Sequence, residues 1–257
     1  MLHNTSMHYI PLVVLLINIM SGFAKKTMLI TGASRGIGLQ LVKSSIAQGY
    51  AVIACCRKSN PALEQVIGAM GDGGHQVVEG ADVDSDAGIA VIKACAETLP
   101  TINVLINNAG ILTEESLSDM TTAEGLDRMR RQFEVNTLGP LRVTAALEHK
   151  LQPGSKVVII TSRMGSMADN SSGGMYGYRV SKSAVNAAAV NLAHSLRPKG
   201  VSVALLHPGM VATDMTAKWG GGISVEESCT GIMQRIEATT MATSGQFYHQ
   251  SGEMLPW

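Results

Sequence analysis

Short apolar runs alternate with longer helix-length stretches along most of the chain, and this alternation predicts the fold class. The runs are rich in β-branched residues, which is typical of buried strands. They lie at residues 27–31, 50–56, 75–82, 102–108, 156–162 and 201–208. Uniformly apolar strands joined by helical crossovers form parallel sheets that are covered on both faces. The pattern therefore predicts a doubly wound parallel β-sheet, the Rossmann fold, in a single domain.

The first 25 residues do not follow this alternation. Residues 10–20 read IPLVVLLINIM, which is apolar apart from Asn18, and Gly22 and Ala24 follow. Such a run is typical of a signal-peptide core or a short membrane anchor, yet no Lys or Arg precedes it. A start-site artefact fits equally well, because Met28 opens the first strand. We therefore separate an N-terminal extension at 1–25 from a catalytic domain at 26–257.

The charge balance argues against a nucleic-acid-binding protein. Twenty Lys and Arg residues match twenty Asp and Glu residues, so the formal net charge is zero. Proteins that bind nucleic acids need a basic surface, which this composition does not provide. Small-molecule ligands are favoured instead.

Cysteine usage bears on metal binding and on the cellular compartment. Cys55, Cys56, Cys95 and Cys229 do not have the spacing of zinc ligands, so we expect no metal site. We expect all four to be reduced and mostly buried, which favours the cytoplasm. The apolar segment at 10–20 leaves a secretory or membrane-associated location open.

A glycine-rich turn follows the first predicted strand and precedes a helical pattern. Gly32, Gly36 and Gly38 lie in the sequence GASRGIG. Glycines here let the backbone approach a pyrophosphate, and the N-terminus of the next helix offers free N–H groups. The G-x-x-x-G-x-G spacing differs from the common G-x-G-x-x-G and is weak by itself. Its place between strand and helix predicts a dinucleotide site.

The residues at the end of the second strand favour NADP(H) over NAD(H). Many NAD-binding folds place an acidic residue there for the ribose 2′-hydroxyl, but this chain has Arg57. Arg57 and Arg35 offer guanidinium groups suited to a 2′-phosphate. The alternative is that both are ordinary solvated arginines.

Polar and small residues also follow the third and fourth strands. Asp82 and Val83 close the third run, and the fourth ends in Asn108, Ala109 and Gly110. Each could be simple turn chemistry. Together, the small pair permits close approach of a cofactor, and the asparagine amide can tie neighbouring strands or meet a ribose.

Tyr178 and Lys182 are the central catalytic candidates. They stand four residues apart in a helical pattern, so both side chains lie on one helix face. Bringing a tyrosine pKa from 10 toward neutrality requires about 4 kcal/mol of phenolate stabilisation, which a neighbouring ammonium would help to supply. Tyr176 has Val180 at the equivalent position and lacks such a partner. By itself the spacing is a frequent accident.

Two further polar residues are catalytic candidates. Ser162 ends the fifth run and could donate a hydrogen bond to a substrate carbonyl, although a serine there more often caps a helix. Asn136, in EVNTLGP, would usually be a structural amide.

Taken together, six motifs resemble those of the short-chain dehydrogenase/reductase family in kind and order. They are TGASRGIG, NNAG, VN, S-x-x-G, YRVSK and HPGMVAT. The resemblance covers nearly all of residues 26–257. Five longer segments are similar to sequences of the C-factor/Sniffer-type carbonyl reductase branch of this family. They are NTLGPLRVTAAL, TSRMGS, YRVSKSAVN, SGQF and GEMLPW.

The resemblance implies a role for each candidate. Tyr178 would be the general acid/base and Ser162 would orient the carbonyl group. Lys182 would bind the nicotinamide ribose and lower the Tyr178 pKa, and Asn136 would support a proton-relay water. It also implies contacts with the cofactor adenine at Asp82 and Val83, with its phosphates at Ser34, Arg35, Gly36 and Ile37, and with its carboxamide at Pro208, Gly209, Val211 and Thr213.

One departure from the family pattern concerns the catalytic serine. Ser162 and Tyr178 are 16 residues apart, wider than the usual interval, because ADNSSGGM lengthens the loop. Ser166 is the alternative serine, although Ser162 keeps a glycine three positions later at Gly165.

The implied function is hydride transfer between NADP(H) and a carbonyl or alcohol substrate, whose identity the sequence leaves open. The segments 163–177 and 215–224 contain glycines and are expected to close over it. A homodimer or homotetramer, formed through helices around 128–147 and 178–196, is also expected. The alternative function is a cofactor-binding signalling or scaffold protein of the same fold with little turnover.

Overall fold

The computed structural model describes residues 25–69, 71 and 73–257. The apolar segment at 10–20, with the anchor or signal peptide predicted there, lies outside the described residues. Among the described helices, none is long and apolar enough to cross a membrane.

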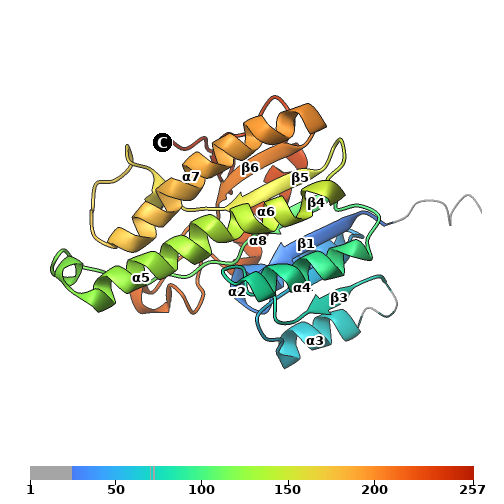
Figure 1. The fold of residues 1–257 in the computed structure, drawn as a ribbon, viewed down its shortest axis with the longest axis horizontal. Helices are drawn as coiled ribbons and strands as arrows, with labels where there is room; N and C mark the ends of the chain where they lie inside the picture. Colours follow the sequence, from blue (N-terminus) through green and yellow to red (C-terminus); the bar gives the residue numbers. More distant parts are fainter. Residues whose placement is uncertain (1–24, 70, 72) are drawn as a thin grey trace, which may run out of the picture.

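Seven parallel strands form one sheet, in the order β3-β2-β1-β4-β5-β6-β7 (Figure 1). Their bounds are Thr27–Thr31 for β1, Ala51–Cys55 for β2, Gln76–Val78 for β3, Val104–Asn107 for β4, Lys156–Ile160 for β5, Ser202–His207 for β6 and Phe247–His249 for β7. The strand order reverses next to β1, which pairs with β2 on one side and β4 on the other. The predicted doubly wound Rossmann fold in a single domain is confirmed.

Helices cover both faces of the sheet. One face is covered by α2 (Gly36–Ala47), α3 (Pro61–Gly68) and α8 (Val225–Ala238). The other face is covered by α4 (Asp86–Glu97), α6 (Gly139–Leu147) and α7 (Tyr176–Leu196), and α5 (Ala123–Phe133) lies beside α7 (Figure 1).

Side chains alternate between the two cores along each strand. Leu29 of β1 and Leu105 of β4 belong to the core under α4, α6 and α7. Met28 and Ile30 of β1 belong to the core under α2, α3 and α8. Because both faces are buried, these strands read as continuous apolar runs in the sequence.

Short helical segments make up much of the remaining connections. They are the 3₁₀ segments η1 (Ser118–Thr121), η3 (Glu148–Lys150), η4 (Arg163–Gly165), η5 (Arg197–Lys199) and η6 (Ala217–Trp219), and the π-helical segment η2 (Glu134–Leu138) between α5 and α6.

The third and seventh strands differ from the sequence prediction. The predicted third strand runs to residue 82, but β3 ends at Val78, and Gly80 has a φ of +75° in the turn that follows. Asp82 and Val83 therefore lie in a loop before α4. The sequence pattern missed β7, because a run of three residues gives too few positions to show a period.

The cysteines have the environment expected from the sequence. All four are free; Cys55, Cys56 and Cys229 are buried, and Cys95 is half-buried. The expectation of reduced, mostly buried thiols is confirmed.

Candidate active site

The carboxyl ends of the strands meet at one edge of the sheet, and the glycine turn lies there. Gly32 and Gly36 have φ values of +67° and +51°, a region that side chains other than glycine rarely adopt. A Cβ on Gly38 would lie 2.1 Å from the Gly32 carbonyl oxygen. All three glycines are therefore needed for the turn to fold back on itself and lead into α2.

Asn108 fastens this turn to β4. Its amide nitrogen donates to the carbonyl oxygens of Thr31 at 3.0 Å and Gly32 at 3.1 Å. In return, the Thr31 hydroxyl accepts hydrogen bonds from the backbone N–H groups of Asn108 at 3.1 Å and Ala109 at 3.2 Å. Of the two roles predicted for the asparagine amide, the one in the structure is the tie between neighbouring strands.

The sequence analysis did not identify the contribution of Thr31 to this turn. A β-branched residue at the end of a strand reads as strand, and its hydrogen bonds to residues 77 and 78 positions later cannot be seen in a local pattern.

The two arginines predicted to favour a 2′-phosphate are both exposed. Arg35 precedes α2, and its guanidinium lies 3.7 Å from the Asp214 carboxylate, in the loop after β6. Arg57 lies just after β2, in a segment joined to the glycine turn, because the Asn60 amide donates to the Ser34 carbonyl oxygen at 2.7 Å. The segments that carry Arg35 and Arg57 are therefore adjacent. That the two arginines favour NADP(H) over NAD(H) remains a prediction.

Asp82 and Val83 lie on the next loop along this edge. Val83 is buried and packs against Gly139 at the start of α6, where a Cβ would meet it at 2.9 Å. Asp82 raises the pKa of the Asp84 carboxyl through a hydrogen bond and its charge, adding to the larger effect of burial, whereas Arg131 lowers it. This loop is thus fixed by α5 and α6.

Ser162, Tyr178 and Lys182 are brought together despite the lengthened loop between Ser162 and α7. Tyr178 is 9% exposed and Lys182 5% exposed. The Lys182 ammonium nitrogen lies 5.7 Å from the centre of the Tyr178 ring and donates to the Ile160 carbonyl oxygen at 2.9 Å. The Ser162 hydroxyl interacts with the Tyr178 phenol and lowers its pKa.

The structure shows Ser162 in the capping role that the sequence also allows, and its donation to a substrate carbonyl stays a prediction. Its hydroxyl accepts a hydrogen bond from the Met164 N–H at 3.1 Å and so caps the short segment η4. The alternative, Ser166, is also buried, but its hydroxyl accepts from the Asp169 N–H at 3.1 Å. Ser162 is the better candidate for an interaction with Tyr178, because its hydroxyl and not that of Ser166 lowers the Tyr178 pKa.

The expected effect of Lys182 on Tyr178 is not found. Burial raises the pKa of the Tyr178 phenol, and the Ser162 hydroxyl opposes this rise. Burial also lowers the pKa of Lys182 to about 8. Both groups are desolvated in the polypeptide. A lowering of the tyrosine pKa by the ammonium together with the positive nicotinamide of an oxidised cofactor stays a prediction.

Asn136 lies in the π-helical segment, where the widened turn aims its amide at the loop after β4. Its side-chain oxygen accepts from the Ile111 N–H at 2.8 Å, and its nitrogen donates to the Ile111 carbonyl at 2.9 Å and the Ser181 hydroxyl at 3.0 Å. A Cβ on Gly110 would come within 3.3 Å of the Asn136 oxygen and 3.7 Å of the Lys182 nitrogen. Small residues after β4 therefore keep the space next to Lys182 open.

The loop after β6 closes the remaining side. Gly209 has a φ of +87°, and the Pro208 carbonyl accepts from the Ser228 hydroxyl at 2.6 Å. Val211 is buried and bridges to Ile223. Thr213 lies beside the glycine turn, since a Cβ on Gly36 would meet its methyl group at 3.5 Å. The residues predicted to contact a carboxamide therefore lie across from the dinucleotide turn.

His207, at the end of β6, was not recognised from the sequence. Its ring lies 5.2 Å from that of His249, between centres, and its Nδ1 atom is buried without a hydrogen-bond partner. Burial, followed by the nearby charges of His249, Arg163 and Lys182, lowers its pKa to about 3. A lone histidine before a proline carries no sequence signal for this, because the perturbing groups come from distant segments.

No metal site accompanies these residues in the part of the chain that the structure describes: groups of three or more His, Cys, Asp or Glu side chains that could hold an ion are absent there. The chemistry available is that of two hydroxyl groups and an ammonium beside a glycine turn at a helix N-terminus.

Comparison with known proteins places this arrangement in a family. The short chain dehydrogenase model matches residues 26–222. The chain is 38% identical over 235 residues to 1-hydroxy-2-glutathionyl-2-methyl-3-butene dehydrogenase from Rhodococcus sp., covering 90% of this chain and 99% of that protein. It is 41% identical over 159 residues to C-signal from Myxococcus xanthus, covering 61% of this chain and 93% of that protein.

Solved structures give the same result. An NADPH-bound carbonyl reductase from chicken fatty liver superposes with a TM-score of 0.79 at 27% identity, covering 91% of this chain and all of that one. The carbonyl reductase Sniffer of D. melanogaster superposes with a TM-score of 0.80 at 28% identity and the same coverage. The resemblance to the C-factor/Sniffer-type branch is confirmed, and the chain belongs to the short-chain dehydrogenase/reductase family.

Proposed function

We propose that the protein is an NADP(H)-dependent oxidoreductase that interconverts a carbonyl compound and an alcohol, with Tyr178 as general acid/base. The observation that carries the proposal is the grouping of Tyr178, Ser162 and Lys182 beside the glycine turn. Ser162 follows the end of β5, whereas Tyr178 and Lys182 lie on α7.

The residues present fit a dinucleotide. The turn is so tight that a Cβ on Gly32 would lie 2.8 Å from the Ala109 backbone, which leaves backbone N–H groups at the start of α2 free for phosphate oxygens. Arg57 stands where NAD-binding folds often carry an acid, and Arg35 is nearby on the turn. A guanidinium suits a 2′-phosphate, and one of the similar solved proteins is bound to NADPH.

The bound cofactor supplies the hydride. The part of the polypeptide is to hold the substrate oxygen and to move a proton. Tyr178 donates its phenolic proton to the oxygen as negative charge develops there, while the Ser162 hydroxyl donates a second hydrogen bond. Lys182 would hold the nicotinamide ribose, and its ammonium together with the positive charge of the oxidised nicotinamide would favour the phenolate that Tyr178 leaves behind. Asn136, which is fixed to Ile111 and Ser181, supports the water that returns the proton.

The side chains around the site favour an apolar substrate. Several large apolar residues on the flanking loops are exposed and could contact a ligand. They are Met167, Met210, Met215 and Trp219. Because methionine adapts its shape to different ligands, we expect aldehydes and ketones with hydrophobic substituents to react faster than small polar ones.

A matched pair of tyrosines on α7 tests the proposal. NADPH oxidation is followed by absorbance with a panel of aldehydes, ketones and quinones. Tyr178→Phe should reduce kcat/KM by about 100-fold or more, the usual contribution of a general acid. Tyr176→Phe should leave it unchanged, because Tyr176 is partly exposed and has no lysine partner. Near-normal turnover by Tyr178→Phe would contradict the assignment, and NADPH binding without turnover of any substrate would favour a scaffold or signalling function.

The cofactor preference has its own test. The Kd values of NADPH and NADH are measured by the quenching of protein fluorescence. Replacing Arg35 and Arg57 with alanine should weaken NADPH binding about 10- to 100-fold, since hydrogen bonds to a charged group contribute about 1.5–3 kcal/mol, and should leave NADH binding unchanged. Equal losses for both cofactors would contradict a role in recognising the 2′-phosphate.

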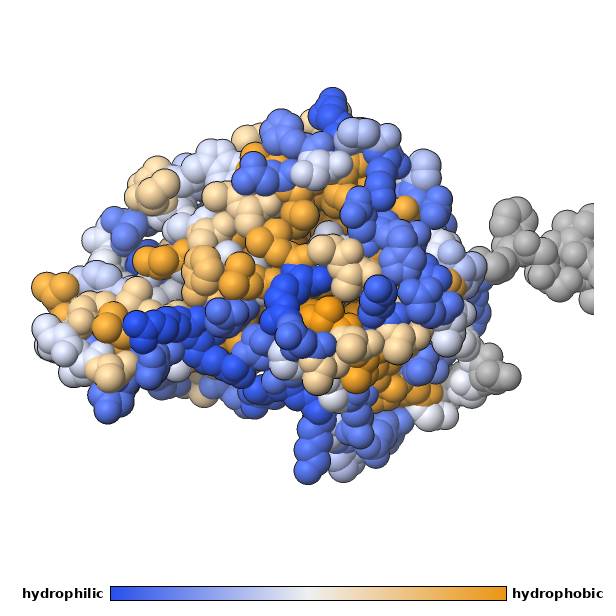
Figure 2. Space-filling model, viewed as in Figure 1, coloured by the Kyte–Doolittle hydropathy of each residue, from blue (hydrophilic) through white to orange (hydrophobic). Residues whose placement is uncertain are grey.

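We also propose that the protein forms a homodimer through α5 and α7. Figure 2 shows hydrophobic side chains at the surface on the face where these helices lie. Leu126 and Phe133 of α5 are each 37% exposed, and Val180 of α7 is 50% exposed. Light scattering during size-exclusion chromatography should give twice the chain mass, and Val180→Glu should give a monomer; a monomeric wild type would contradict the proposal.

A further inference from the structure

A buried carboxylate, Glu115, lies next to the catalytic helix without belonging to the candidate site described above. We propose that Glu115 is a positioning residue that sets the place of Tyr178 by holding the first turn of α7. The inference rests on the proposed function, in which Tyr178 transfers the proton. Glu115 is 3% exposed, in the loop between β4 and α5.

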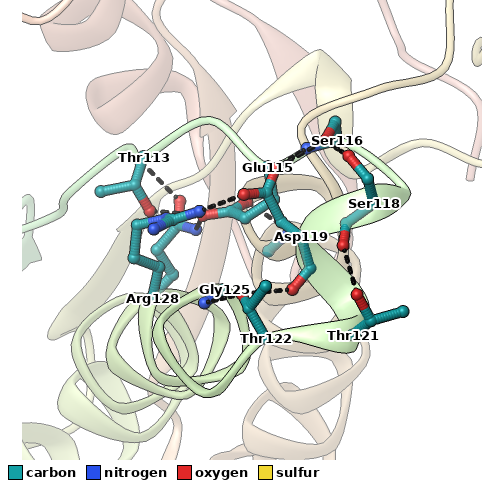
Figure 3. Close-up of polar contacts among 11 residues, drawn as sticks. Thr113, Glu115, Ser116, Ser118, Asp119, Thr121, Thr122, Gly125 and Arg128 are labelled. Carbon is teal, nitrogen blue, oxygen red and sulfur yellow. Dashed lines mark hydrogen bonds and ion pairs between the residues drawn. The ribbon is translucent and has the colours of Figure 1, made fainter.

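Glu115 accepts hydrogen bonds from three parts of the chain. Figure 3 shows it together with Thr113 and Arg128. One carboxylate oxygen accepts from the Thr113 hydroxyl at 2.6 Å and from the Gln132 amide at 2.9 Å. The other accepts from the backbone N–H of Gly177 at 3.0 Å. The Arg128 guanidinium lies 3.9 Å from the first oxygen. A buried carboxylate is costly without partners, and these donors satisfy it in one geometry.

The contact with Gly177 replaces a helix cap. Met175, which precedes α7, is in the left-handed region with a φ of 49° and provides no side-chain cap. The first N–H groups of a helix lack partners within the helix and favour a negative charge. Glu115 supplies both an acceptor and a charge, from 62 residues away in the sequence.

The close approach depends on the absence of a side chain at Gly177. A Cβ there would lie 2.3 Å from the Gln132 amide nitrogen and 3.0 Å from the Glu115 carboxylate. The first turn of the helix therefore packs against the carboxylate at Gly177, one residue before Tyr178. Moving Glu115 would move the backbone that carries the phenol.

A second polar link holds α7 on the other side of Tyr178. Asn136 donates to the Ser181 hydroxyl at 3.0 Å, and that hydroxyl donates to the Tyr178 carbonyl oxygen at 2.8 Å. Both links begin on the segment after β4, because Asn136 binds Ile111 and Glu115 lies four residues later. Glu115 and Asn136 thus fix the tyrosine to the same loop, which lies beside the site.

The first test compares two acidic residues of the same turn. Glu115→Ala should lower kcat about 10- to 100-fold, as expected when a catalytic group is misplaced by about 1 Å, with little change in KM for NADPH. The control is Asp119→Asn, because Asp119 also pairs with Arg128, at 2.8 Å, and binds the Ser116 N–H, at 2.7 Å. Asp119→Asn should lower thermal stability and leave kcat unchanged.

The second test exchanges the side chains of Glu115 and Gln132, and it applies even if Glu115→Ala unfolds. In Glu115→Gln alone, the new amide nitrogen faces a donor in either orientation: the Gly177 N–H in one, and in the other the Gln132 amide nitrogen, because the Gln132 oxygen already accepts from the Thr113 N–H at 3.0 Å. Adding Gln132→Glu restores a donor and an acceptor, while the remaining side-chain oxygen at position 115 still accepts from Gly177. We expect kcat to fall in Glu115→Gln and to recover at least half of the loss in the double variant.

Hydrogen exchange provides a readout that is independent of activity. The amides of residues 177–179 should exchange about tenfold faster in Glu115→Ala than in the wild type, since a lost hydrogen bond contributes about 1.5 kcal/mol, whereas Asp119→Asn should not change them. Wild-type kcat and normal exchange in folded Glu115→Ala would overturn the inference. No turnover by the wild type would instead overturn the proposed function and leave the exchange experiment to decide on Glu115.

Discussion

Replacing Lys182 with methionine should make the protein more stable at neutral pH and remove part of its dependence on pH. The Lys182 ammonium is buried and has a single hydrogen bond, to the Ile160 carbonyl oxygen. Burial lowers its pKa from 10.5 to about 8. Because the pKa is lower in the folded chain, the folded state is disfavoured wherever the lysine is protonated.

The size and sign follow from this difference. A change of one in pKa corresponds to about 1.4 kcal/mol, so the protonated lysine costs the folded state about 3 kcal/mol at pH 7. Between pH 8 and 10.5 the folded protein has released this proton while the unfolded chain still holds it. The free energy of unfolding therefore rises with pH in this window, and about 2 kcal/mol is regained by about pH 9.5.

Urea unfolding at about pH 7 and about pH 9.5 measures the effect. The free energy of unfolding of Lys182→Met minus that of the wild type should decrease by about 2 kcal/mol between the two pH values. Other titrating groups cancel in this difference, and so does the pH-independent loss of the Ile160 hydrogen bond. Lys93→Met, on the exposed side of α4, controls for the removal of any lysine. A difference that is the same at both pH values would refute the argument that Lys182 is desolvated.

Two further predictions concern the glycine turn and the end of β6. Gly38→Ala should destabilise the fold by at least about 2 kcal/mol and weaken NADPH binding, because its Cβ would meet the Gly32 carbonyl at 2.1 Å. The control Gly68→Ala should stabilise α3 slightly, because a Cβ there meets nothing within 4 Å. Urea unfolding and fluorescence titration with NADPH compare the two variants. His207 has a pKa of about 3, so only the unfolded chain takes up its proton as the pH falls below 6.5. His207→Gln should therefore lose about 2 kcal/mol less stability than the wild type between about pH 6.5 and 5; equal losses would show that this histidine titrates normally.

The sequence predicted those features that depend on a local pattern. Six of the seven strands, the glycine turn and the helix that carries Tyr178 and Lys182 follow from apolar runs, glycine spacing and helical periodicity. The place of Ser162 also followed, because the carboxyl ends of parallel strands share one edge. The sequence could not show whether the segment ADNSSGGM moves Ser162 away from Tyr178. In the structure the longer loop leaves the two residues together.

The features that the sequence did not predict arise from contacts between distant segments. β3 stops at Val78 because Gly80 turns the chain. The pKa of Tyr178 rises because burial outweighs the opposing effect of the Ser162 hydroxyl. Glu115 reads as a polar loop residue, and its burial depends on α5 and α7 packing over it. Such environments are set by tertiary structure, which no window of the sequence contains.

The cost of Lys182 also bears on the choice between an enzyme and a scaffold. A protein that only had to hold its fold, or to present a bound cofactor, would gain about 3 kcal/mol from an apolar residue at this position, a large share of the stability of a domain of this size. Destabilising ionisable groups persist where their chemistry is used. Glu115 differs in kind, since its carboxylate is fully satisfied by donors and holds the helix that carries Lys182 and Tyr178. The combination of one costly cation on α7 with one well-satisfied anion that packs against the start of the same helix favours catalysis over a purely structural role.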